Sequence, residues 1–237
     1  CNYRNFQNKN LEFSKKNVII IGMNGSGKTN LLESISLLSP GKGIKNTNLE
    51  EYLNYNSTLQ TKSWSIQLSI QSHVYDSLEI TNQNNKKTIS VNNKIIKNID
   101  EINKKFSIVW LTPLFDTIFI GTKSTRTKFF DKIVTELFPK HHKMINELEK
   151  LMYERLQILK NYEDNNWLNK IETKLVEISM IISHARVESL KLLNNEINLL
   201  EDRVFPKGLI YANGKYEKMI NSNESIINTQ HQLTADL

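Results

Sequence analysis

Eight residues near the N-terminus constrain this chain more than any other part of its 237-residue sequence. The stretch GMNGSGKT matches the pattern G-x-x-x-x-G-K-[ST], follows the apolar run Val18–Ile21 and precedes an amphipathic run, Lys28–Leu38. Glycines let the backbone curl so that its N–H groups face phosphate oxygens, and the N-terminus of the following helix adds positive charge. We therefore predict a phosphate-binding loop that consists of Gly22, Met23, Asn24, Gly25, Ser26, Gly27, Lys28 and Thr29.

Two side chains of this loop have defined tasks at a nucleoside triphosphate. Lys28 reaches the β- and γ-phosphates as a point charge, and the hydroxyl of Thr29 ligates Mg²⁺. ATP and Mg²⁺ are therefore the expected cofactors, with Thr29 as the metal ligand. A glycine-rich turn that binds nothing is the alternative, but the strand predicted before the loop and the helix predicted after it argue against that alternative.

Composition and charge exclude some classes of protein and leave others open. Hydrophobic residues make up 39% of the chain, and no apolar run approaches the roughly 18 residues of a membrane span. The single cysteine, Cys1, fits a reducing cytosol, so we expect a cytoplasmic protein without membrane contact. A net charge of +6 is compatible with DNA as a partner, but a solvated basic surface would give the same value.

Apolar patterns predict further elements on both sides of the loop. Residues 64–80 alternate apolar and polar side chains, which is typical of a half-exposed antiparallel strand, and Asn92-Asn93 indicates a turn between two strands. We expect a helix over residues 124–137 and a hairpin turn at Asn213-Gly214. The strands expected to be short or buried are Leu11–Phe13, Val18–Ile21 and Ser107–Leu111.

The stretch between Pro139 and Pro206 has neither glycine nor proline, and it predicts two long helices. Apolar residues recur at helical spacing in its first part, namely Ile145, Leu148, Met152, Leu156 and Leu159. A heptad pattern follows in Leu168, Ile171, Leu175, Ile178, Ile182 and Ala185. We interpret the pair as an antiparallel helical arm, although two ordinary core helices would give the same spacing.

The predicted fold class is α/β, a P-loop ATPase head with a mixed β-sheet and an inserted antiparallel helical lobe. Residues 1–138 would form the N-terminal part of the head, residues 139–204 the arm, and residues 205–237 the return toward the head.

No acidic residue ends the apolar stretches SIVWLTP and GLIYANG, although a P-loop enzyme needs one to orient Mg²⁺ and water. The sequence therefore gives little support to a GTPase or a small-molecule kinase. In a head interrupted by an inserted arm, however, the acidic residue would lie far downstream of the loop.

Several short stretches resemble one family in the order in which they occur. They are similar to the RecF family, whose members have heads of the SMC and ABC type. The stretches are NYRNF, GMNGSGKTNLLESISLL, VWLTPLFDTIF, TRTKFFDKIV, FPKHH and the pair YERLQIL and WLNKIE. The loop alone is widely shared, but its combination with Arg4-Asn5, Trp110–Pro113 and Arg126–Asp131 is specific. The resemblance extends over essentially the whole chain.

This resemblance implies a DNA repair and replication function. Members of the family bind ATP and DNA, form an ATP-dependent homodimer around two nucleotides, and act with RecO and RecR to load recombinase at single-stranded gaps or gapped duplexes. The resemblance also places Arg4 and Asn5 near the nucleotide. Lys45 stands where relatives often have arginine, and we expect it to be solvated.

Two departures from the family pattern concern hydrolysis. Leu114 stands where some relatives have a polar residue that can sense Mg²⁺ or water, and Thr127 replaces the second of two arginines. The family's signature motif and second acidic motif are not found, so we expect a fragment trimmed at both ends and leave open whether the full-length protein is a weak ATPase. The alternatives are a nucleotide-gated adaptor that does not hydrolyse ATP, and another P-loop ATPase such as a transporter subunit or kinase.

Overall fold

The computed structural model forms two compact units, Cys1–Leu111 and Thr112–Leu237, which we call unit 1 and unit 2. The lobe boundaries expected at residues 138 and 204 differ from this division and stay a prediction. No helix in the described part of the chain is long and apolar enough to cross a membrane. The structure describes residues 1–38, 43–45, 47–54, 63–71, 75–83, 85–96, 107–113, 115, 118–161, 165–200, 206–222 and 226–236.

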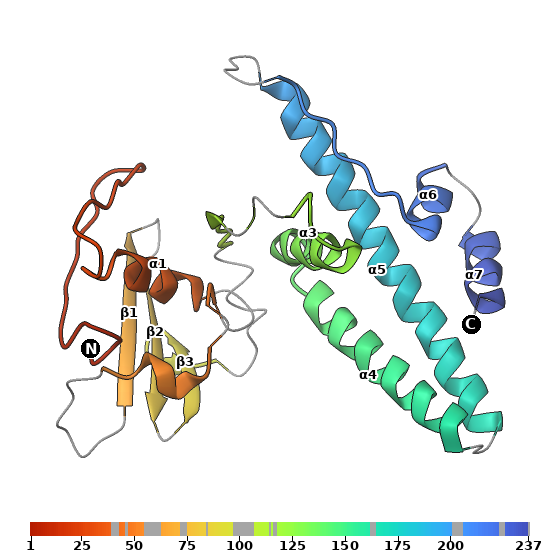
Figure 1. Ribbon diagram of the computed structural model, residues 1–237, viewed down its shortest axis with the longest axis horizontal. Coiled ribbons are helices and arrows are strands. Elements are labelled where there is room, and N and C mark those ends of the chain that lie inside the picture. The colour runs from red at the N-terminus through yellow and green to blue at the C-terminus, as the bar shows by residue number, and fades with distance from the viewer. Residues whose placement is uncertain are drawn as a thin grey trace. The chain divides into compact units, whose positions relative to one another are not determined.

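Unit 1 contains an antiparallel sheet whose strands follow one another in the order β1-β2-β3-β4. The first three strands are labelled in Figure 1. Its strands are β1 (Ser63–Gln71), β2 (Tyr75–Gln83), β3 (Lys86–Val91) and β4 (Lys94–Ile95). The alternating stretch 64–80 is thus two strands and not one, because the chain reverses between β1 and β2. The turn predicted at Asn92-Asn93 is confirmed, since it joins β3 to β4 and both residues have positive φ, 50° and 63°.

One face of this sheet forms the core of unit 1. Alternating positions of the strands place Trp64, Leu78 and Ile80 in this core, each at most 2% exposed. The rings of Tyr3 and Tyr52 stack at 5.7 Å, and both meet Trp64 edge-on. The core is closed by helix α1 (Lys28–Ser36), its C-terminal neighbours Leu37 and Leu38, and the 3₁₀ turn η1 (Leu49–Tyr52).

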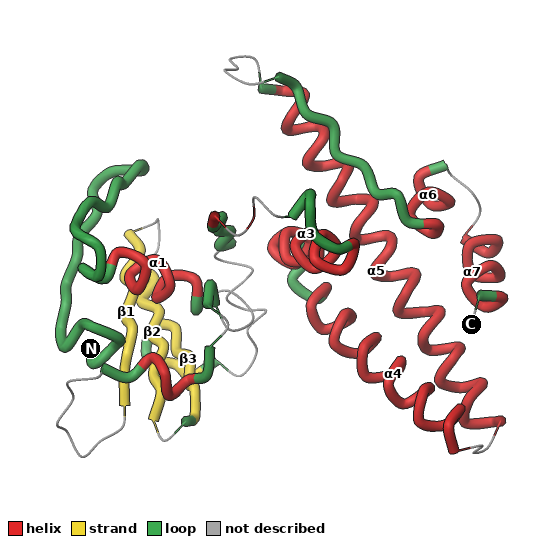
Figure 2. The backbone as a smooth tube through the Cα atoms, viewed as in Figure 1, coloured by secondary structure: helices red, strands yellow, loops and turns green. Residues whose placement is uncertain are grey.

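Three stretches predicted as short or buried strands have no regular secondary structure. Residues 11–13, 18–21 and 107–111 are irregular, which is drawn as green loop in Figure 2. Ile19 and Ile21 are 85% and 89% exposed, so the prediction of a buried strand before the loop is wrong for this structure. A run of apolar β-branched residues favours a strand, but a strand also needs a hydrogen-bonded neighbouring strand. Among the described residues, no strand pairs with residues 18–21.

Unit 2 is helical. Its helices are α3 (Lys123–Leu137), α4 (His141–Asn161), α5 (Asn165–Leu199), α6 (Lys215–Asn221) and α7 (Ile226–Ala235). Helices α4 and α5 lie side by side as an antiparallel hairpin (Figure 1), as predicted. Helix α3 confirms the helix expected over residues 124–137.

The α5 side of this hairpin confirms its heptad pattern, whereas the α4 side differs from the prediction. Ile171, Leu175, Ile178 and Ile182 are all buried. On α4, however, the packed residues are Leu148, Leu151 and Ile158. The predicted Met152, Leu156 and Leu159 are 45–49% exposed, because α4 carries apolar residues on two neighbouring stripes and only one faces α5.

The hairpin turn expected at Asn213-Gly214 is wrong. Gly214 has φ −77° and ψ 149°, an extended conformation, and it is the N-cap of α6. The carboxylate of Glu217 lies where a Cβ on Gly214 would be, so the helix begins with an acid over its N-terminus.

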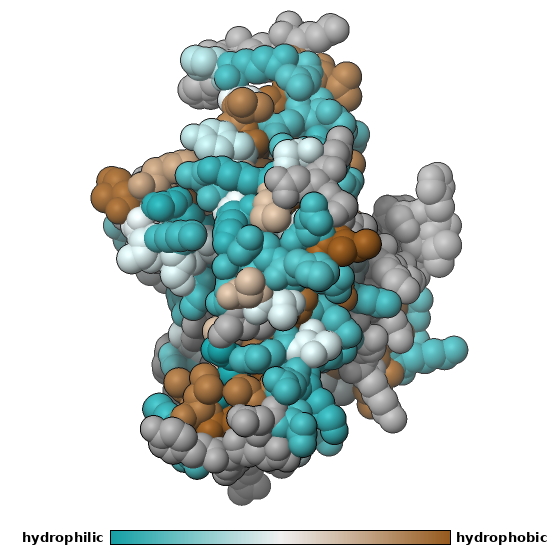
Figure 3. Space-filling model, turned by 90° about the vertical axis from the view of Figure 1, so that its right-hand side faces the viewer, coloured by the Kyte–Doolittle hydropathy of each residue, from teal (hydrophilic) through white to brown (hydrophobic). Residues whose placement is uncertain are grey.

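The face of the molecule in Figure 3 is mostly hydrophilic, with apolar side chains in separate small patches.

Candidate functional site

The predicted phosphate loop lies in unit 1 and leads directly into α1. Gly25 and Gly27 have φ of 80° and 97°, in the left-handed region that favours glycine. The N–H of Ser26 donates to the carbonyl of Met23 at 3.2 Å, which closes a turn inside the loop. Gly27 is the N-cap of α1, so the loop ends at the N–H groups of a helix N-terminus, which attract anions.

The ammonium of Lys28 lies over the loop itself. Its Nζ donates to the carbonyls of Gly22 and Met23 at 2.7 and 2.8 Å. These acceptors are neutral, and a phosphate oxygen is a stronger acceptor for an ammonium donor because it is charged. Lys28 is therefore held beside the loop in a position from which it can transfer its hydrogen bonds to a bound phosphate.

The residues around Thr29 fit a magnesium ion that takes most of its ligands from elsewhere. Thr29 lies exposed in the first turn of α1, so its hydroxyl can reach a ligand at the loop. Mg²⁺ prefers oxygen ligands and usually combines one or two from the protein with water and phosphate. In the described ranges, no cluster of three or more His, Cys, Asp or Glu side chains could hold a metal.

Asn5 lies against the phosphate loop. Its Nδ2 donates to the carbonyl of Ser26 at 3.4 Å, and its Oδ1 accepts from Nδ2 of Asn30 at 3.0 Å. A Cβ on Gly27 would lie 2.5 Å from this amide and 2.6 Å from the ring of Phe6. The close approach of Asn5 to the loop therefore depends on glycine at position 27, independently of the backbone angle there.

Arg4, which the family resemblance places near the nucleotide, points into the core of unit 1. It forms a two-pronged ion pair with Glu33 of α1, with N–O distances of 3.1 and 3.0 Å. Its guanidinium also donates to the carbonyl of Glu51 at 2.7 Å and lies 4.7 Å from the centre of the Tyr52 ring. Burial raises the pKa of Tyr52, which marks this surrounding as poorly hydrated.

Lys45 is exposed, as expected of a solvated residue, but it is also held by two partners. Its Nζ lies 3.5 Å from a carboxylate oxygen of Glu33 and donates to Oδ1 of Asn30 at 3.0 Å. Sequence reasoning missed Glu33 and Asn30. The available signal for Glu33 was an acidic residue on a face of α1 whose neighbours, Leu37 and Leu38, are buried.

The other predicted positions belong to unit 2 or lie outside the described residues. Leu114 is one of the residues that the structure does not describe. Thr127 lies in α3, where its hydroxyl donates to the carbonyl of Lys123 at 3.0 Å, and Arg126 donates to the carbonyl of Gly121 at 2.7 Å. Both side chains therefore bond to backbone within or beside their own helix.

Unit 2 also contains a polar cluster that the sequence did not reveal. Asp131 accepts two bonds at 2.8 Å from Arg186 and one of 2.9 Å from His141. Arg186 reaches further, to Glu217 at 3.0 Å. Burial alone would raise the pKa of Asp131, but the hydrogen bonds and charges of His141 and Arg186 outweigh it and hold that pKa below its usual value.

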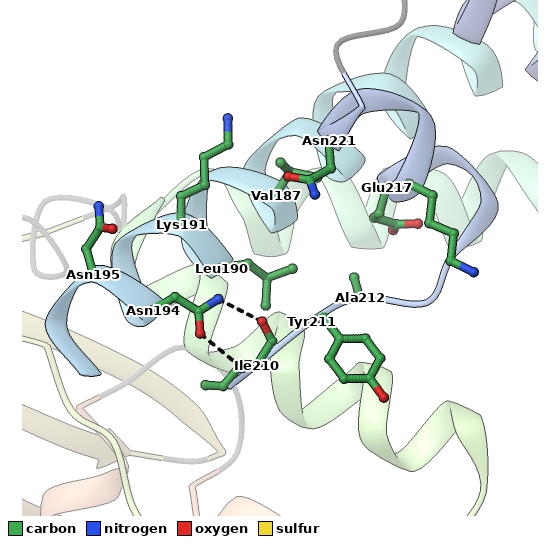
Figure 4. Close-up of a pocket in the computed structure, with 11 residues that line it drawn as sticks. Val187, Leu190, Lys191, Asn194, Asn195, Ile210, Tyr211, Ala212, Glu217 and Asn221 are labelled. Carbon is green, nitrogen blue, oxygen red and sulfur yellow. Dashed lines mark hydrogen bonds between the residues drawn. The ribbon is translucent and has the colours of Figure 1, made fainter. Parts of the chain in front are cut away.

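A cavity of about 410 Å³ in unit 2 is separate from the predicted site (Figure 4). It lies between α5, the extended residues 210–212 and α6. The amide of Asn194 closes one end, because it donates to the carbonyl of Ile210 at 2.7 Å and accepts from the N–H of Ile210 at 3.0 Å. Its lining mixes apolar Val187 and Leu190 with Lys191, whereas every residue predicted to bind nucleotide lies in unit 1.

Known proteins match this chain at the level of sequence. Residues 1–235 match the AAA domain family. The DNA replication and repair protein RecF of Rickettsia bellii (strain OSU 85-389) is 38% identical over 235 residues, which cover 95% of this chain and 62% of that protein. The RecF protein of Rickettsia canadensis (strain McKiel) is 37% identical over 245 residues, covering 100% and 64%. The chain thus spans less than two thirds of the length of these relatives.

Solved structures match the fold. The recombination mediator protein RecF-ATPrS of the RecFOR pathway superposes with a TM-score of 0.73 at 25% identity, covering 83% of this chain and 54% of that one. A second structure, RecF-ATP of the same pathway, has a TM-score of 0.70 at 24% identity over 98% of this chain and 67% of that one. The resemblance to RecF and the fold class, an ATPase domain that combines helices with a sheet, are confirmed.

Proposed function

The chain belongs to the AAA domain family, and from this premise we propose that residues Gly22–Thr29 bind ATP with Mg²⁺. The backbone N–H groups of the loop would surround the phosphates, Lys28 would contact the β- and γ-phosphates, and Thr29 would ligate the metal. Asn5 would contribute to the nucleotide site from beside the loop, and Arg4 would support the site from the core through its ion pair with Glu33.

The geometry of the loop is the observation that supports this proposal. Two left-handed glycines precede a helix N-terminus, and the lysine that follows them has its ammonium 2.7–2.8 Å from loop carbonyls. This arrangement offers fixed N–H dipoles and one positive charge, both of which favour a polyphosphate.

Competition between nucleotides tests the proposal. A fluorescent ATP analogue is titrated with the protein in the presence of Mg²⁺ and then displaced with ATP, ADP or AMP. Because the loop recognises phosphates, ATP should displace the probe at the lowest concentration and AMP at the highest. Equal displacement by AMP and ATP would contradict the assignment.

We further propose that the protein acts in DNA replication and repair in the cytoplasm, as the RecF relatives are named to do. DNA, either single-stranded or gapped duplex, would be its substrate, RecO and RecR its partners, and an ATP-dependent homodimer its active form. The whole protein would be a weak ATPase. The names of its relatives and its net charge of +6 support this part of the proposal.

A gel-shift experiment tests the DNA part. Binding through phosphates releases counterions, so the affinity should be tolerant of sequence and fall by at least about tenfold between roughly 50 and 200 mM salt. ATP should strengthen it. Binding that is insensitive to salt and selective for one sequence would contradict the proposal.

A further inference from the structure

A continuous chain of polar contacts links the core of unit 1 with the phosphate loop. Its members, in order of contact, are Arg4, Glu33, Lys45, Asn30 and Asn5. Each contact joins residues that are between 12 and 29 positions apart in the sequence, and the two ends of the chain of contacts differ in their burial. One end is a buried ion pair, whereas the other is an amide beside the loop.

The buried end is firmly held. The carboxylate of Glu33 is fully buried and the side chain of Arg4 is 6% exposed. Arg4 is fixed in turn by the hydroxyl of Thr47 at 3.3 Å and by the carbonyl of Glu51 at 2.7 Å. The second oxygen of Glu33 lies 3.5 Å from Nζ of Lys45, which therefore occupies a defined place although its side chain is 38% exposed.

The ammonium of Lys45 determines how both amides are oriented. An ammonium only donates, so the oxygen of Asn30 must face Lys45 and its NH₂ group must face Asn5. The oxygen of Asn5 then accepts from Asn30, and the NH₂ group of Asn5 faces the carbonyl of Ser26. Without the ammonium, the oxygen of Asn30 would lose this partner, and the orientation of both amides would depend on the carbonyl of Ser26.

The last contact concerns the peptide between Ser26 and Gly27. In a trans peptide the C=O and N–H groups point in opposite directions, and the described residues contain no cis peptide. A bond from Asn5 to the carbonyl of Ser26 therefore directs the N–H of Gly27 away from Asn5. That N–H is one of the loop donors available to a phosphate.

We infer that Lys45, Asn30 and Asn5 form a relay, anchored by Arg4–Glu33, that positions the phosphate loop through the carbonyl of Ser26. Lys45 and Asn30 are positioning residues in this scheme and do not touch the nucleotide. The inference rests on the proposed function for its effect on ATP, but the order of the loop without nucleotide follows from the contacts alone.

A double-mutant cycle with Lys45→Met and Asn30→Leu tests the relay. Each single variant should raise the Kd for MgATP about three- to tenfold, the effect of one lost hydrogen bond. Because the two residues act in series, the double variant should be no weaker than the weaker single variant. Lys45→Arg, which keeps a donor, should restore most of the affinity, and Lys94→Met, an exposed lysine of β4, should bind like the wild type.

Hydrogen exchange of residues 22–29 without nucleotide gives a readout that does not depend on ATP. Both single variants should exchange faster in this segment, while their thermal unfolding midpoints stay close to that of the wild type. Effects on the Kd that multiply would show that Lys45 acts directly on the nucleotide and would overturn the relay. Wild-type affinity and exchange in both variants would overturn it as well.

The relay and the proposed ATP site fail in different ways. Lys28→Ala should abolish ATP binding and leave the order of residues 22–29 dependent on Lys45. If Lys28→Ala binds ATP like the wild type, the ATP site is wrong, and the exchange of the loop in Lys45→Met and Asn30→Leu alone supports or overturns the relay.

Discussion

Gly27 combines two constraints at one Cα atom. Its φ of 97° lies in a region that costs other residues about 1–3 kcal/mol, and a Cβ there would meet the amide of Asn5 and the ring of Phe6. Gly27→Ala should therefore lower the free energy of unfolding by about 1–3 kcal/mol and abolish ATP binding. Urea unfolding and nucleotide titration measure the two effects.

Gly208 provides the matched control for this substitution. It is exposed, and a Cβ there would meet no atom of the described residues within 4 Å. Gly208→Ala should change the free energy of unfolding by no more than about 0.5 kcal/mol. If both variants behave alike, the local requirement for glycine at position 27 is wrong.

The loop could be predicted at the level of single residues, but its surroundings could not. A fixed spacing of glycine, lysine and threonine is enough to predict a phosphate loop, because the backbone of eight consecutive residues makes most of it. The partner of Arg4, by contrast, is Glu33, 29 residues away. Contacts of this kind depend on how α1 packs on the core, and no pattern of neighbouring residues in the sequence predicts that packing.

At the scale of elements, the α4–α5 hairpin offers a direct comparison of two leucines. Leu175 of α5 is 1% exposed, whereas Leu159 of α4 is 45% exposed, although both fit a helical apolar pattern. Leu175→Ala should cost about 2–5 kcal/mol in the free energy of unfolding, and Leu159→Ala about 1 kcal/mol or less. Equal losses in urea unfolding would show that α4 packs on α5 through the stripe that we first predicted.

Asp131 of α3 connects its helix to α4 and α5 through ion pairs. It bonds to His141 at the start of α4 and to Arg186 of α5, and Arg186 continues to Glu217 of α6. Removing the carboxylate leaves partly buried Arg186 with Glu217 as its one anionic partner among the described residues, so Asp131→Asn should lower the free energy of unfolding by about 2–3 kcal/mol. Glu188→Gln, which breaks an exposed pair with Lys191, should change it little.

Asp131 should also make the free energy of unfolding depend on pH. The pKa of Asp131 is lower in the folded protein than in the unfolded chain, where it is about 4. Its contribution to stability is therefore fully present above about pH 4 and is lost as the pH falls through the folded pKa. Unfolding curves between about pH 7 and pH 3 should converge for the wild type and Asp131→Asn, and a difference that stays constant would contradict this account.

The predictions that failed at this scale share a physical cause. The apolar stretches at 18–21 and 107–111 have the composition of strands but lie irregular and largely exposed, because strand pairing depends on distant parts of a chain. Helices α3, α4 and α5 were predicted successfully, since each satisfies its backbone hydrogen bonds internally. The heptad of α5 needed no information beyond its own sequence.

For the whole molecule, the structure supports a nucleotide site in unit 1 and a separate helical unit. The phosphate loop, the ion pair of Arg4 with Glu33 and the relay through Lys45 all belong to unit 1. The matches to RecF proteins extend over both units, so the proposed DNA function concerns the whole chain. Its dependence on ATP requires that the loop binds nucleotide.

Equilibrium binding of labelled MgATP to the wild type and to Lys28→Ala tests this requirement most directly. Within the part of the chain that the structure describes, the ammonium of Lys28 bonds to loop carbonyls alone, so its removal should leave the thermal unfolding midpoint nearly unchanged. We predict saturable binding to the wild type and an affinity at least about 100-fold lower, or no binding, for the variant. Unchanged affinity in a folded Lys28→Ala protein would contradict the central claim.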